Sequence, residues 1–271
     1  MRDGVTAVRA VIFDWAGTIA DFGSRAPVGA FVELFRRGGI TLSEAEARGP
    51  MGMAKRSHIA ELLRLPGVIE QWRERHGAAA VEADLDRLYG EFIVLQSSIL
   101  ARHADVIPGC LDTLAELRKA GIGIGSTTGY SRSMMDILEP AVAANGLALD
   151  VVVTVDDVPQ GRPAPWMALT AAMRLGAYPV GACVKVGDTL VDIGEGLNAG
   201  MWTVGVTETG NELGLAEAEL AALPAEERAR SGSAAEQKLR RAGAHYVIPG
   251  VSQLMPVIAE ISARLARGER P

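Results

Sequence analysis

The sequence predicts an α/β fold: a Rossmann-like, doubly wound parallel sheet core with an all-α domain inserted after its first strand. Three observations predict this fold. A short apolar run, Val8 to Phe13, is rich in β-branched residues and leads into a Gly-Thr turn, as a buried strand does. About 80 residues with helical periodicity and no strand pattern come next. From Val106 onward short apolar strands alternate with helices, the pattern of a parallel sheet covered on both faces.

The composition indicates a globular protein. The chain has 271 residues, 48% of them hydrophobic, which is enough for a full core and for two domains. A net charge of -6 argues against a nucleic-acid partner, although it allows a local cationic pocket. The two cysteines, Cys110 and Cys183, give no disulfide framework, so we expect a reduced, cytoplasmic setting. No apolar run reaches membrane-spanning length and no signal pattern is present, so we expect no membrane partner.

The inserted segment contains five predicted helices, which glycine and proline separate at "RRGG", "RGPMGM" and "RLPG". We therefore expect residues 24–105 to form a helical cap domain and residues 1–23 plus 106–271 to form the α/β core. An insertion here lies beside the carboxyl ends of the strands, where open sheets bind ligands, so the cap is expected to act as a lid. The predicted helices are Pro27–Arg37, Glu44–Arg48, Lys55–Leu63, Gly67–His76 and Val81–His103.

The rest of the chain supplies the other strands and their covering helices. The predicted strands are Gly121–Ser126, Val151–Val155, Ala182–Val186, Met201–Val206 and His245–Ile248. The predicted helices are Leu111–Ala120, Ser131–Ala144, Ala164–Leu175, Val191–Ala199 and Val251–Ala266, with Ser131 as an N-cap. The Ala/Glu-rich stretch Glu208–Ala244 is expected to be helical and peripheral.

Polar residues follow four stretches that end near the same edge of the predicted sheet. They are Asp14 in "FDWAGT", Thr128 in "GSTTGY", Arg162 in "GRPAPW", and Asp188 with Asp192 in "GDTLVD". Carboxylates gathered without sulfur or imidazole ligands favour a hard cation, Mg²⁺ by preference. Together with Arg162, such a cation would neutralise a phosphoryl group and leave Asp14 free to attack phosphorus.

Each of these residues also has a purely structural interpretation. An Asp after a strand is commonly a turn or cap residue, and Asp188 or Thr189 would serve as the N-cap of the next helix. Arg162 would equally suit a solvated loop. The "GIGIG" run lies within a strand and lacks the spacing of a dinucleotide fingerprint. The set becomes specific only when the residues are taken together, in this order and at strand ends.

Taken together, these motifs resemble the haloacid dehalogenase superfamily of aspartate-nucleophile phosphotransferases. Its four signatures correspond to Asp14–Thr18, Thr128, Arg162 and Asp188–Asp192. The chain departs from the usual pattern twice. Ala16 stands where a second Asp usually acts as the acid for the leaving group, and Arg162 stands in place of the usual Lys.

Those departures and the cap sequence resemble the phosphonatase family within that superfamily. The likeness covers most of the chain and is weakest in Glu208–Ala244. It implies cleavage of the carbon–phosphorus bond of phosphonoacetaldehyde in the degradation of 2-aminoethylphosphonate. The stretches that carry it are "FDWAGTIADFGSRAP", "GPMGMAKRSHI", "GSTTGYSRSMM", "GRPAPWM" and "VKVGDTLVDIGEG".

The resemblance to phosphonatases also assigns roles to particular residues. It implies that Lys55 in the cap forms a Schiff base with the substrate aldehyde and that Asp14 becomes an aspartyl phosphate. It implies one Mg²⁺ per subunit, held by the Asp14 and Asp188 carboxylates and the backbone carbonyl of Ala16, a ligand that survives loss of an acidic side chain. Asp192 is expected to orient Asp188 or a metal-bound water. The family also implies a homodimer formed through the cap.

The residues around Lys55 bear on the Schiff-base assignment. A lysine on a helix is usually solvated, but the flanking "GPMGMA" is small and apolar, which favours a neutral amine. His58, three residues later, shares its helical face and is a candidate proton shuttle. Thr128 is expected to donate a hydrogen bond to a phosphoryl oxygen, and Tyr130 to border the substrate pocket. Met51 and Met53 are interpreted as packing residues.

Three other functions compete with carbon–phosphorus cleavage. A phosphate-ester hydrolase or mutase releases an alkoxide that benefits from an acid, and Ala16 argues against it. A carbon–halogen hydrolase needs no metal, and the acidic pair Asp188 and Asp192 argues against it. A non-catalytic binding protein is disfavoured because Asp14, Thr128, Arg162, Asp188 and Lys55 are all retained.

Overall fold

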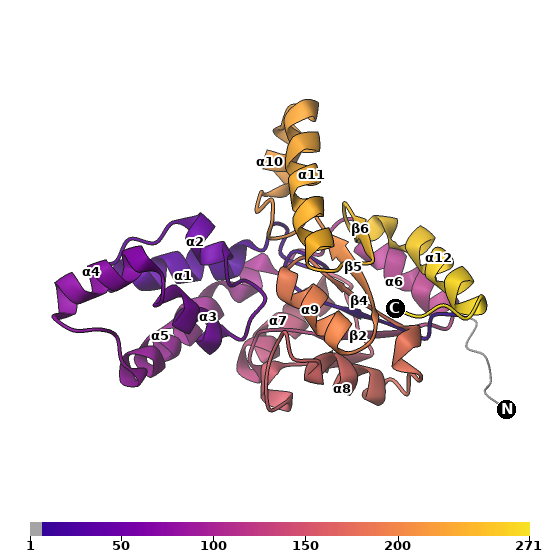
Figure 1. Cartoon of the computed structure of the whole chain (residues 1–271), viewed down its shortest axis with the longest axis horizontal. Coiled ribbons are helices and arrows are strands. Elements are labelled where there is room, and N and C mark those ends of the chain that lie inside the picture. Colours follow the sequence, from indigo (N-terminus) through magenta and orange to yellow (C-terminus); the bar gives the residue numbers. More distant parts are fainter. Residues whose placement is uncertain (1–6) are drawn as a thin grey trace.

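The computed structural model describes residues 7–271, and its centre is a six-stranded parallel sheet (Figure 1). The strand order is β3-β2-β1-β4-β5-β6, so the chain winds outward from β1 in both directions. This order confirms the predicted doubly wound α/β fold and places the carboxyl end of β1 at the topological switch point. The strands are β1 Ala10–Phe13, β2 Gly123–Thr127, β3 Val151–Val153, β4 Cys183–Gly187, β5 Trp202–Val206 and β6 Tyr246–Ile248.

Helices cover both faces of the sheet, as alternate residues of β1 make clear. Val11 and Phe13 belong to a large hydrophobic cluster with residues of α6, α7 and α12, whereas Ala10 and Ile12 belong to a separate cluster with residues of α8. Both faces of β1 are therefore buried, which explains its continuous apolar run. The helices are α6 Cys110–Lys119, α7 Arg132–Ala144, α8 Trp166–Arg174, α9 Leu190–Asn198 and α12 Leu254–Ala266.

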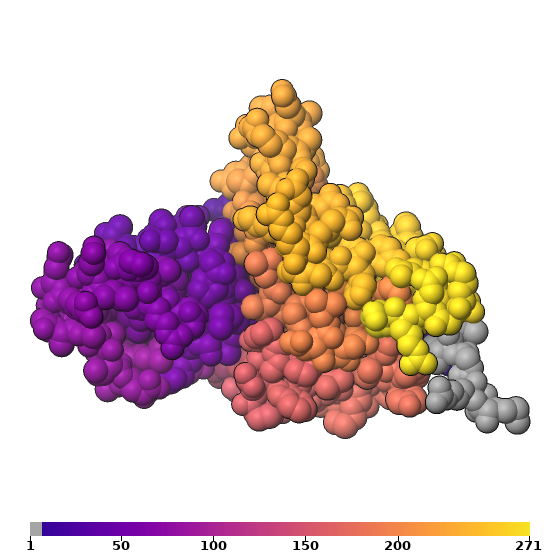
Figure 2. Space-filling view, in the orientation of Figure 1, coloured from indigo at the N-terminus to yellow at the C-terminus, as the bar shows by residue number. Residues whose placement is uncertain are grey.

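The inserted helices form a separate lobe beside the sheet (Figures 1 and 2). Phe31 of α1 stacks on Phe92 of α5 at 4.3 Å between ring centroids and anchors the lobe's interior. The two chain passages into the lobe run side by side, since the Asp21 amide donates to the Asp105 carbonyl at 3.1 Å. The elements are α1 Arg25–Arg37, α2 Glu44–Arg48, α3 Lys55–Leu62, α4 Pro66–His76 and α5 Glu82–Leu100, followed by the 3-10 turn η1 Ala101–His103.

Three local predictions need correction. The last inserted helix ends at Leu100 rather than running on to His103. Ser131 does precede α7, but its hydroxyl lies 3.0 Å from that of Ser133 and makes no capping bond to the backbone. The strand predicted for Val151–Val155 ends at Val153, because a 3-10 turn begins at Val155. In the first and third cases a 3-10 turn occupies or follows the predicted end of the element.

The stretch Glu208–Ala244 differs most from its prediction. It contains two helices, α10 Glu217–Ala222 and α11 Ala225–Arg241, which lie in the part of the chain that projects from the body of the protein (Figures 1 and 2). The segment before them, residues 207–216, is not helical, and its Thr209 and Asn211 are buried. Gly210 and Gly214 interrupt this segment, and Gly214 adopts a φ of +65°, which a helix does not accommodate.

Within residues 7–271, no helix is both long enough and apolar enough to cross a membrane.

Candidate active site

The sheet brings the predicted site residues to one pocket at the carboxyl ends of its strands. Asp14 follows β1, Thr128 follows β2, Asp188 follows β4, and Arg162 precedes α8. The inserted helices contribute Lys55, the first residue of α3. The pocket is lined by Asp14, Ala16, Ser24, Pro27, Met51, Gly52, Lys55, Thr128, Gly129, Tyr130, Arg162, Asp188 and Thr189.

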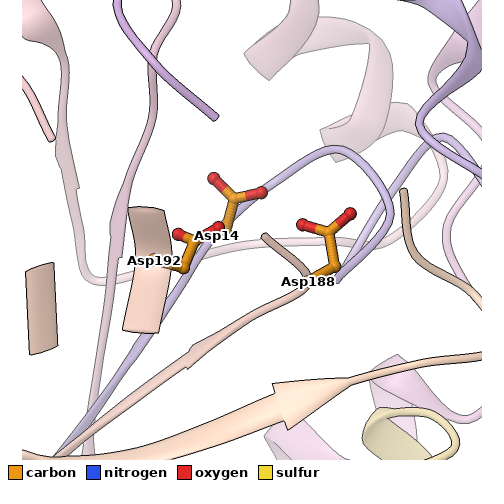
Figure 3. Close-up of side chains that lie close together, drawn as sticks. All are labelled: Asp14, Asp188 and Asp192. Atoms are coloured by element: carbon orange, nitrogen blue, oxygen red, sulfur yellow. The ribbon is translucent and has the colours of Figure 1, made fainter. Parts of the chain in front are cut away.

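Three carboxylates gather at this edge of the sheet (Figure 3). Asp14, Asp188 and Asp192 each offer an oxygen within 4.8 Å of the others, and all three side chains are buried. Burial, together with the charge of Asp192, raises the pKa of Asp14. Burial, together with the charges of Asp14 and Asp192, raises the pKa of Asp188 well above its ordinary value. A divalent cation would relieve this repulsion and stabilise the ionised carboxylates.

Neighbouring backbone fixes the position of Asp188. Its Oδ2 accepts a hydrogen bond from the Asn211 amide at 2.8 Å, and its Oδ1 accepts one from the Thr18 hydroxyl at 3.4 Å. Gly17 adopts a φ of +80°, and a Cβ there would lie 2.3 Å from Asp188 Oδ2. The glycine after Ala16 is therefore required both by its conformation and by the close approach of the carboxylate.

Arg162 is the central cation of the site and is almost fully buried. Its Nη1 donates to Asp14 Oδ1 at 2.6 Å, and its Nε donates to Glu195 Oε2 at 2.9 Å. Its Nη2 donates to the carbonyl oxygen and the hydroxyl of Thr127 at 2.6 and 2.7 Å. Although burial opposes the charge, the carboxylates of Asp192, Asp14 and Glu195 raise the pKa of Arg162. The alternative of a solvated loop arginine does not hold.

Two further charged residues of the site, Lys185 and Glu195, went unnoticed in the sequence. Lys185 lies within the fully buried strand β4, and its Nζ is 2.7 Å from Asp192 Oδ1 and 3.5 Å from Glu195 Oε2. Glu195 Oε2 also accepts from the Thr127 hydroxyl at 3.0 Å. The sequence does contain a signal for this cluster, which is a lysine in the middle of an otherwise apolar strand. A buried ammonium needs carboxylate partners, so such a lysine predicts buried acidic residues nearby.

Asp192 faces these cations rather than the pocket. Its Oδ1 lies 3.0 Å from Arg162 Nη1 and accepts from Lys185, and its Oδ2 accepts from the amide and hydroxyl of Thr189. Burial opposes its ionisation, but Arg162 and Lys185 lower the pKa of Asp192 overall. Thr189, not Asp188, is the N-cap of α9, and Asp192 completes its capping box.

The donor set fits a divalent cation. Four buried carboxylates, those of Asp14, Asp188, Asp192 and Glu195, surround two buried cations, Arg162 and Lys185. Asp14, Asp192 and Glu195 each pair with Arg162 or Lys185, whereas Asp188 pairs with no Lys, Arg or His among residues 7–271, so a divalent cation beside Asp188 would supply the missing positive charge. Asp14, Ala16 and Asp188 line the pocket, whereas Asp192 is already satisfied by protein donors. The pocket thus contains the three residues that the family resemblance implies as metal ligands.

Lys55 is buried, with 5% of its surface exposed, so it is not the solvated helix lysine of the structural alternative. Its Nζ lies 4.7 Å from the centroid of the Tyr130 ring and 5.8 Å from that of the Phe31 ring. Burial lowers the pKa of Lys55 to about 8, against the attraction of Asp14. About a tenth of this amine is therefore neutral at pH 7, far more than for a lysine in water, and the neutral form is the one that a nucleophilic lysine requires.

His58 lies one turn after Lys55 and is also buried. Its Nε2 is 2.9 Å from the Ala47 carbonyl oxygen, and its ring packs on Phe31 at 3.8 Å between centroids. Since a carbonyl only accepts, Nε2 carries the proton, and Nδ1 has no hydrogen-bond partner among the described residues. Burial and the charge of Lys55 lower the pKa of His58 to about 3, so its ring stays neutral.

Thr128 and Tyr130 complete the wall opposite the inserted helices. Thr128 Oγ1 accepts from the Tyr130 amide at 3.2 Å, which leaves its hydroxyl proton free to donate. Burial, with the carboxylates of Asp21, Asp14 and Asp188, raises the pKa of Tyr130 well above its usual value. Tyr130 is thus a neutral phenol beside the Lys55 amine. Met51 is buried and also lines the pocket.

Comparisons with known proteins find relatives over nearly the whole chain. A family model described as haloacid dehalogenase-like hydrolase matches residues 8–200. The chain is 49% identical over 264 residues to a phosphonoacetaldehyde hydrolase of Paraburkholderia phytofirmans, covering 97% of this chain and 99% of that protein. It is 49% identical over 273 residues to one of Aeromonas hydrophila, covering 99% of this chain and 97% of the relative. The crystal structure of a phosphonoacetaldehyde hydrolase-like protein from Oleispira antarctica matches with a TM-score of 0.96 at 45% identity, covering 97% of this chain and 96% of the other.

Proposed function

Because this chain belongs to the haloacid dehalogenase-like hydrolases, and within them to the phosphonoacetaldehyde hydrolases, we propose that it hydrolyses phosphonoacetaldehyde to acetaldehyde and phosphate through a lysine imine. One observation carries this proposal: Lys55, buried and with a lowered pKa, lines the same pocket as Asp14. An amine nucleophile and a carboxylate nucleophile in one small pocket suit a substrate with an aldehyde at one end and a phosphoryl group at the other.

The first chemical step in this proposal occurs at Lys55. Its neutral Nζ attacks the aldehyde carbon, and water leaves to give a protonated imine. The imine is an electron sink two bonds from phosphorus. We propose His58, three residues along α3 with an unpartnered Nδ1, as the group that moves protons in this step; its lowered pKa makes it a weak base.

The second step occurs at Asp14. Its Oδ1 accepts from Arg162, while its Oδ2 accepts no hydrogen bond from residues 7–271 and is the oxygen proposed to attack phosphorus. The electrons of the carbon–phosphorus bond pass into the imine and give an enamine rather than a free carbanion. The enamine is then protonated on carbon. One water hydrolyses the aspartyl phosphate and another hydrolyses the resulting imine, which releases phosphate and acetaldehyde and restores both side chains.

Other residues of the pocket are proposed to hold the phosphoryl group. Arg162 supplies a fixed positive charge, and the Thr128 hydroxyl donates to a phosphoryl oxygen. We propose that one Mg²⁺ per subunit binds Asp14, the Ala16 carbonyl and Asp188 and, when bound, neutralises charge on the phosphoryl oxygens. Asp192 pairs with Arg162 and Lys185, and we propose that it acts as a supporting residue.

Product release tests the proposed function directly. Phosphonoacetaldehyde should yield phosphate and acetaldehyde in equal amounts when Mg²⁺ is present, and chelation should abolish both. A panel of phosphate esters should be inactive, because Ala16 supplies no acid for an alkoxide leaving group. Turnover of esters with none of the phosphonate would instead identify a phosphatase of the same fold, and metal-independent release of halide would identify a carbon–halogen hydrolase.

Two substitutions test the assigned nucleophiles. Borohydride added with substrate should trap a reduced adduct on Lys55, and Lys55→Arg should lose both the adduct and turnover while keeping its circular dichroism. Asp14→Asn should lose phosphate release yet still form the Lys55 adduct, since the imine precedes attack on phosphorus. An unmodified Lys55 peptide after trapping would contradict the imine, and a substantially active Asp14→Asn enzyme would contradict the aspartyl phosphate.

We further propose a cytoplasmic homodimer that acts in degradation of 2-aminoethylphosphonate. The two cysteines are unpaired and buried, which suits a reducing compartment. On α5 of the inserted helices, Val94 exposes 71% of its surface, and the surface around it is where we expect the subunits to meet. Light scattering of wild type and of Val94→Asp tests the contact, because the substitution should yield monomers if the face is buried.

A further inference from the structure

The loop between β5 and α10, residues 207–216, touches several parts of the active site. The Thr209 hydroxyl donates to the Gly17 carbonyl oxygen at 2.7 Å, beside the nucleophile. The Thr209 carbonyl accepts from the Gly23 amide at 2.8 Å, in the passage to the inserted helices. The Asn211 amide donates to Asp188 Oδ2 at 2.8 Å. The loop therefore connects the Asp188 carboxylate to the segment on which the inserted helices would move.

Arg48, the last residue of α2, reaches across to this loop from the inserted helices. Its Nη1 donates to the Gly23 carbonyl at 2.9 Å and to Asn211 Oδ1 at 3.3 Å, and its Nη2 donates to the Gly214 carbonyl at 3.0 Å. Asn211 Nδ2 in turn donates to the Arg48 carbonyl at 3.3 Å. The two residues thus exchange hydrogen bonds between side chain and backbone, and every acceptor of the guanidinium lies outside the inserted helices.

The backbone of the loop is shaped to receive this guanidinium. Gly214 adopts a φ of +65°, and a Cβ at this position would lie 2.4 Å from Arg48 Cζ. A glycine is therefore needed for both the conformation and the close approach. By contrast Arg56, a cation of the same insertion, pairs within residues 7–271 with Glu82 and Asp86 of α5 alone. Arg48 is distinctive because its bonds cross from the lobe to the site.

We propose that Arg48 is a positioning residue: it fastens the inserted helices to the loop of residues 207–216 and, through Asn211, fixes the amide that holds Asp188. The inference rests on the proposed function only in taking Asp188 as a Mg²⁺ ligand. Its consequence is a coupling between closure of the lobe and metal affinity. Such a coupling is reciprocal, so closure strengthens Mg²⁺ binding and Mg²⁺ favours closure.

The test measures Mg²⁺ affinity by calorimetry and lobe closure by hydrogen–deuterium exchange, with no phosphonate present. Arg48→Gln removes the guanidinium and retains a polar side chain. We expect it to weaken Mg²⁺ binding by about tenfold or more, as loss of charged hydrogen bonds does. We also expect faster exchange in residues 49–54 and 208–214. Arg56→Gln is the matched control, because it removes the same charge from the same lobe, and it should change neither measurement.

Asn211→Ala provides a second, independent variant. It removes the carboxamide that pairs with Arg48 and keeps the backbone amide that donates to Asp188. It should weaken Mg²⁺ binding as Arg48→Gln does. The double variant should bind Mg²⁺ no more weakly than whichever single variant has the lower affinity. Wild-type Mg²⁺ affinity in Arg48→Gln, or strictly additive losses in the double variant, would overturn the proposal. Inactivity of the wild type toward phosphonoacetaldehyde would refute the proposed function. It would not affect the Mg²⁺ affinity and exchange measurements, which use no phosphonate.

Discussion

Lys55 illustrates how burial makes a reactive group from an ordinary one. A lysine in water has a pKa near 10.5, so almost none of it is neutral at pH 7. Here the inserted helices, the Tyr130 ring and the Phe31 ring exclude water from the amine. Burial penalises the charged form and lowers the pKa to about 8. The nearby Asp14 partly opposes this shift, so desolvation contributes more to the pKa of Lys55 than the charge of Asp14 does.

The first prediction concerns the pH dependence of imine formation. The neutral amine attacks, and the protonated amine does not, so the rate of borohydride trapping with substrate should rise with pH and level off above about 8. The rate should be measured from the mass of the Lys55 peptide. Another positive charge nearby disfavours the ammonium, so Mg²⁺ should move the midpoint to lower pH. A midpoint near 10.5 would mean that Lys55 is solvated in the working enzyme.

A second prediction concerns Ala16, the residue that lacks the usual acid. A carbon leaving group needs no proton from this position, because its electrons pass into the Lys55 imine. Ala16 lines the same pocket as Lys55, so a carboxylate there would pair with the amine and hold it protonated.

We therefore expect Ala16→Asp to bind Mg²⁺ with near wild-type affinity, since the backbone carbonyl is unchanged, and to trap Lys55 at least about tenfold more slowly at pH 7. Ala16→Ser is the control, because it adds polar bulk without charge. Wild-type trapping and turnover in Ala16→Asp would count against this account of the missing acid.

At the scale of the element, the segment before α3 brings Lys55 to the sheet. Gly52 adopts a φ of +87°, and a Cβ there would lie 2.3 Å from Thr189 Oγ1 and 2.6 Å from Val191 Cγ2. Gly129 lies equally close to this segment, since its Cβ would be 2.5 Å from the Met53 carbonyl oxygen. The segment before α3 therefore packs closely on the start of α9 through Gly52 and on the loop after β2 through Gly129.

The third prediction compares two glycines of the insertion. Gly52→Ala should displace the segment that carries Lys55 and lower kcat/KM by about 100-fold, because catalytic geometry tolerates little displacement. Gly90→Ala, within α5 and with no atom within 4 Å of the added Cβ, should instead raise the free energy of unfolding by about 1 kcal/mol and leave kcat/KM unchanged. Steady-state kinetics and urea unfolding of both variants provide the comparison. Equal effects of the two substitutions would refute the role assigned to Gly52.

Strand β4 supplies the element-scale feature that hydrophobic patterning missed. All five of its residues are buried, and Lys185 among them contacts Asp192 and Glu195. A strand pattern identifies which residues are buried but not which distant carboxylates will meet a buried ammonium. That pairing requires α9 to cross back over β4, so it follows from the packing of the two elements.

On the scale of the whole molecule, the fourth prediction concerns metal and stability. The raised pKa values of Asp14 and Asp188 mean that the folded protein binds protons more tightly than the unfolded chain. Without metal, stability should therefore fall as pH rises and these two carboxyls ionise. Mg²⁺ offsets that cost, because it stabilises the ionised pair.

At a concentration a hundredfold above its Kd, Mg²⁺ should raise the free energy of unfolding by about 3 kcal/mol, and the gain should grow with pH. Asp188→Asn should lose most of the gain, whereas Asp86→Asn, an exposed carboxylate of the inserted helices, should retain it. Thermal and urea unfolding with and without chelator provide the measurement. An equal Mg²⁺ effect in Asp188→Asn and wild type would place the metal elsewhere.

The sequence by itself determined the fold class and the set of residues at the switch point. Buried parallel strands read as apolar runs, and topology brings their carboxyl ends to one edge, so Asp14, Thr128 and Asp188 were predictable from order and spacing alone. The glycine and proline breaks likewise delimited the inserted helices to within a few residues.

Only the tertiary structure determines which residues pair with each buried charged side chain. Glu195 and Arg48 lie far along the chain from several of their partners, and no local pattern encodes those contacts. Asn211 lies in a stretch that composition predicted to be helical and peripheral, yet its backbone amide holds Asp188. Local sequence governs backbone conformation and burial, whereas the pairing of buried charges depends on how distant elements pack, because desolvation makes each ion require a partner in space.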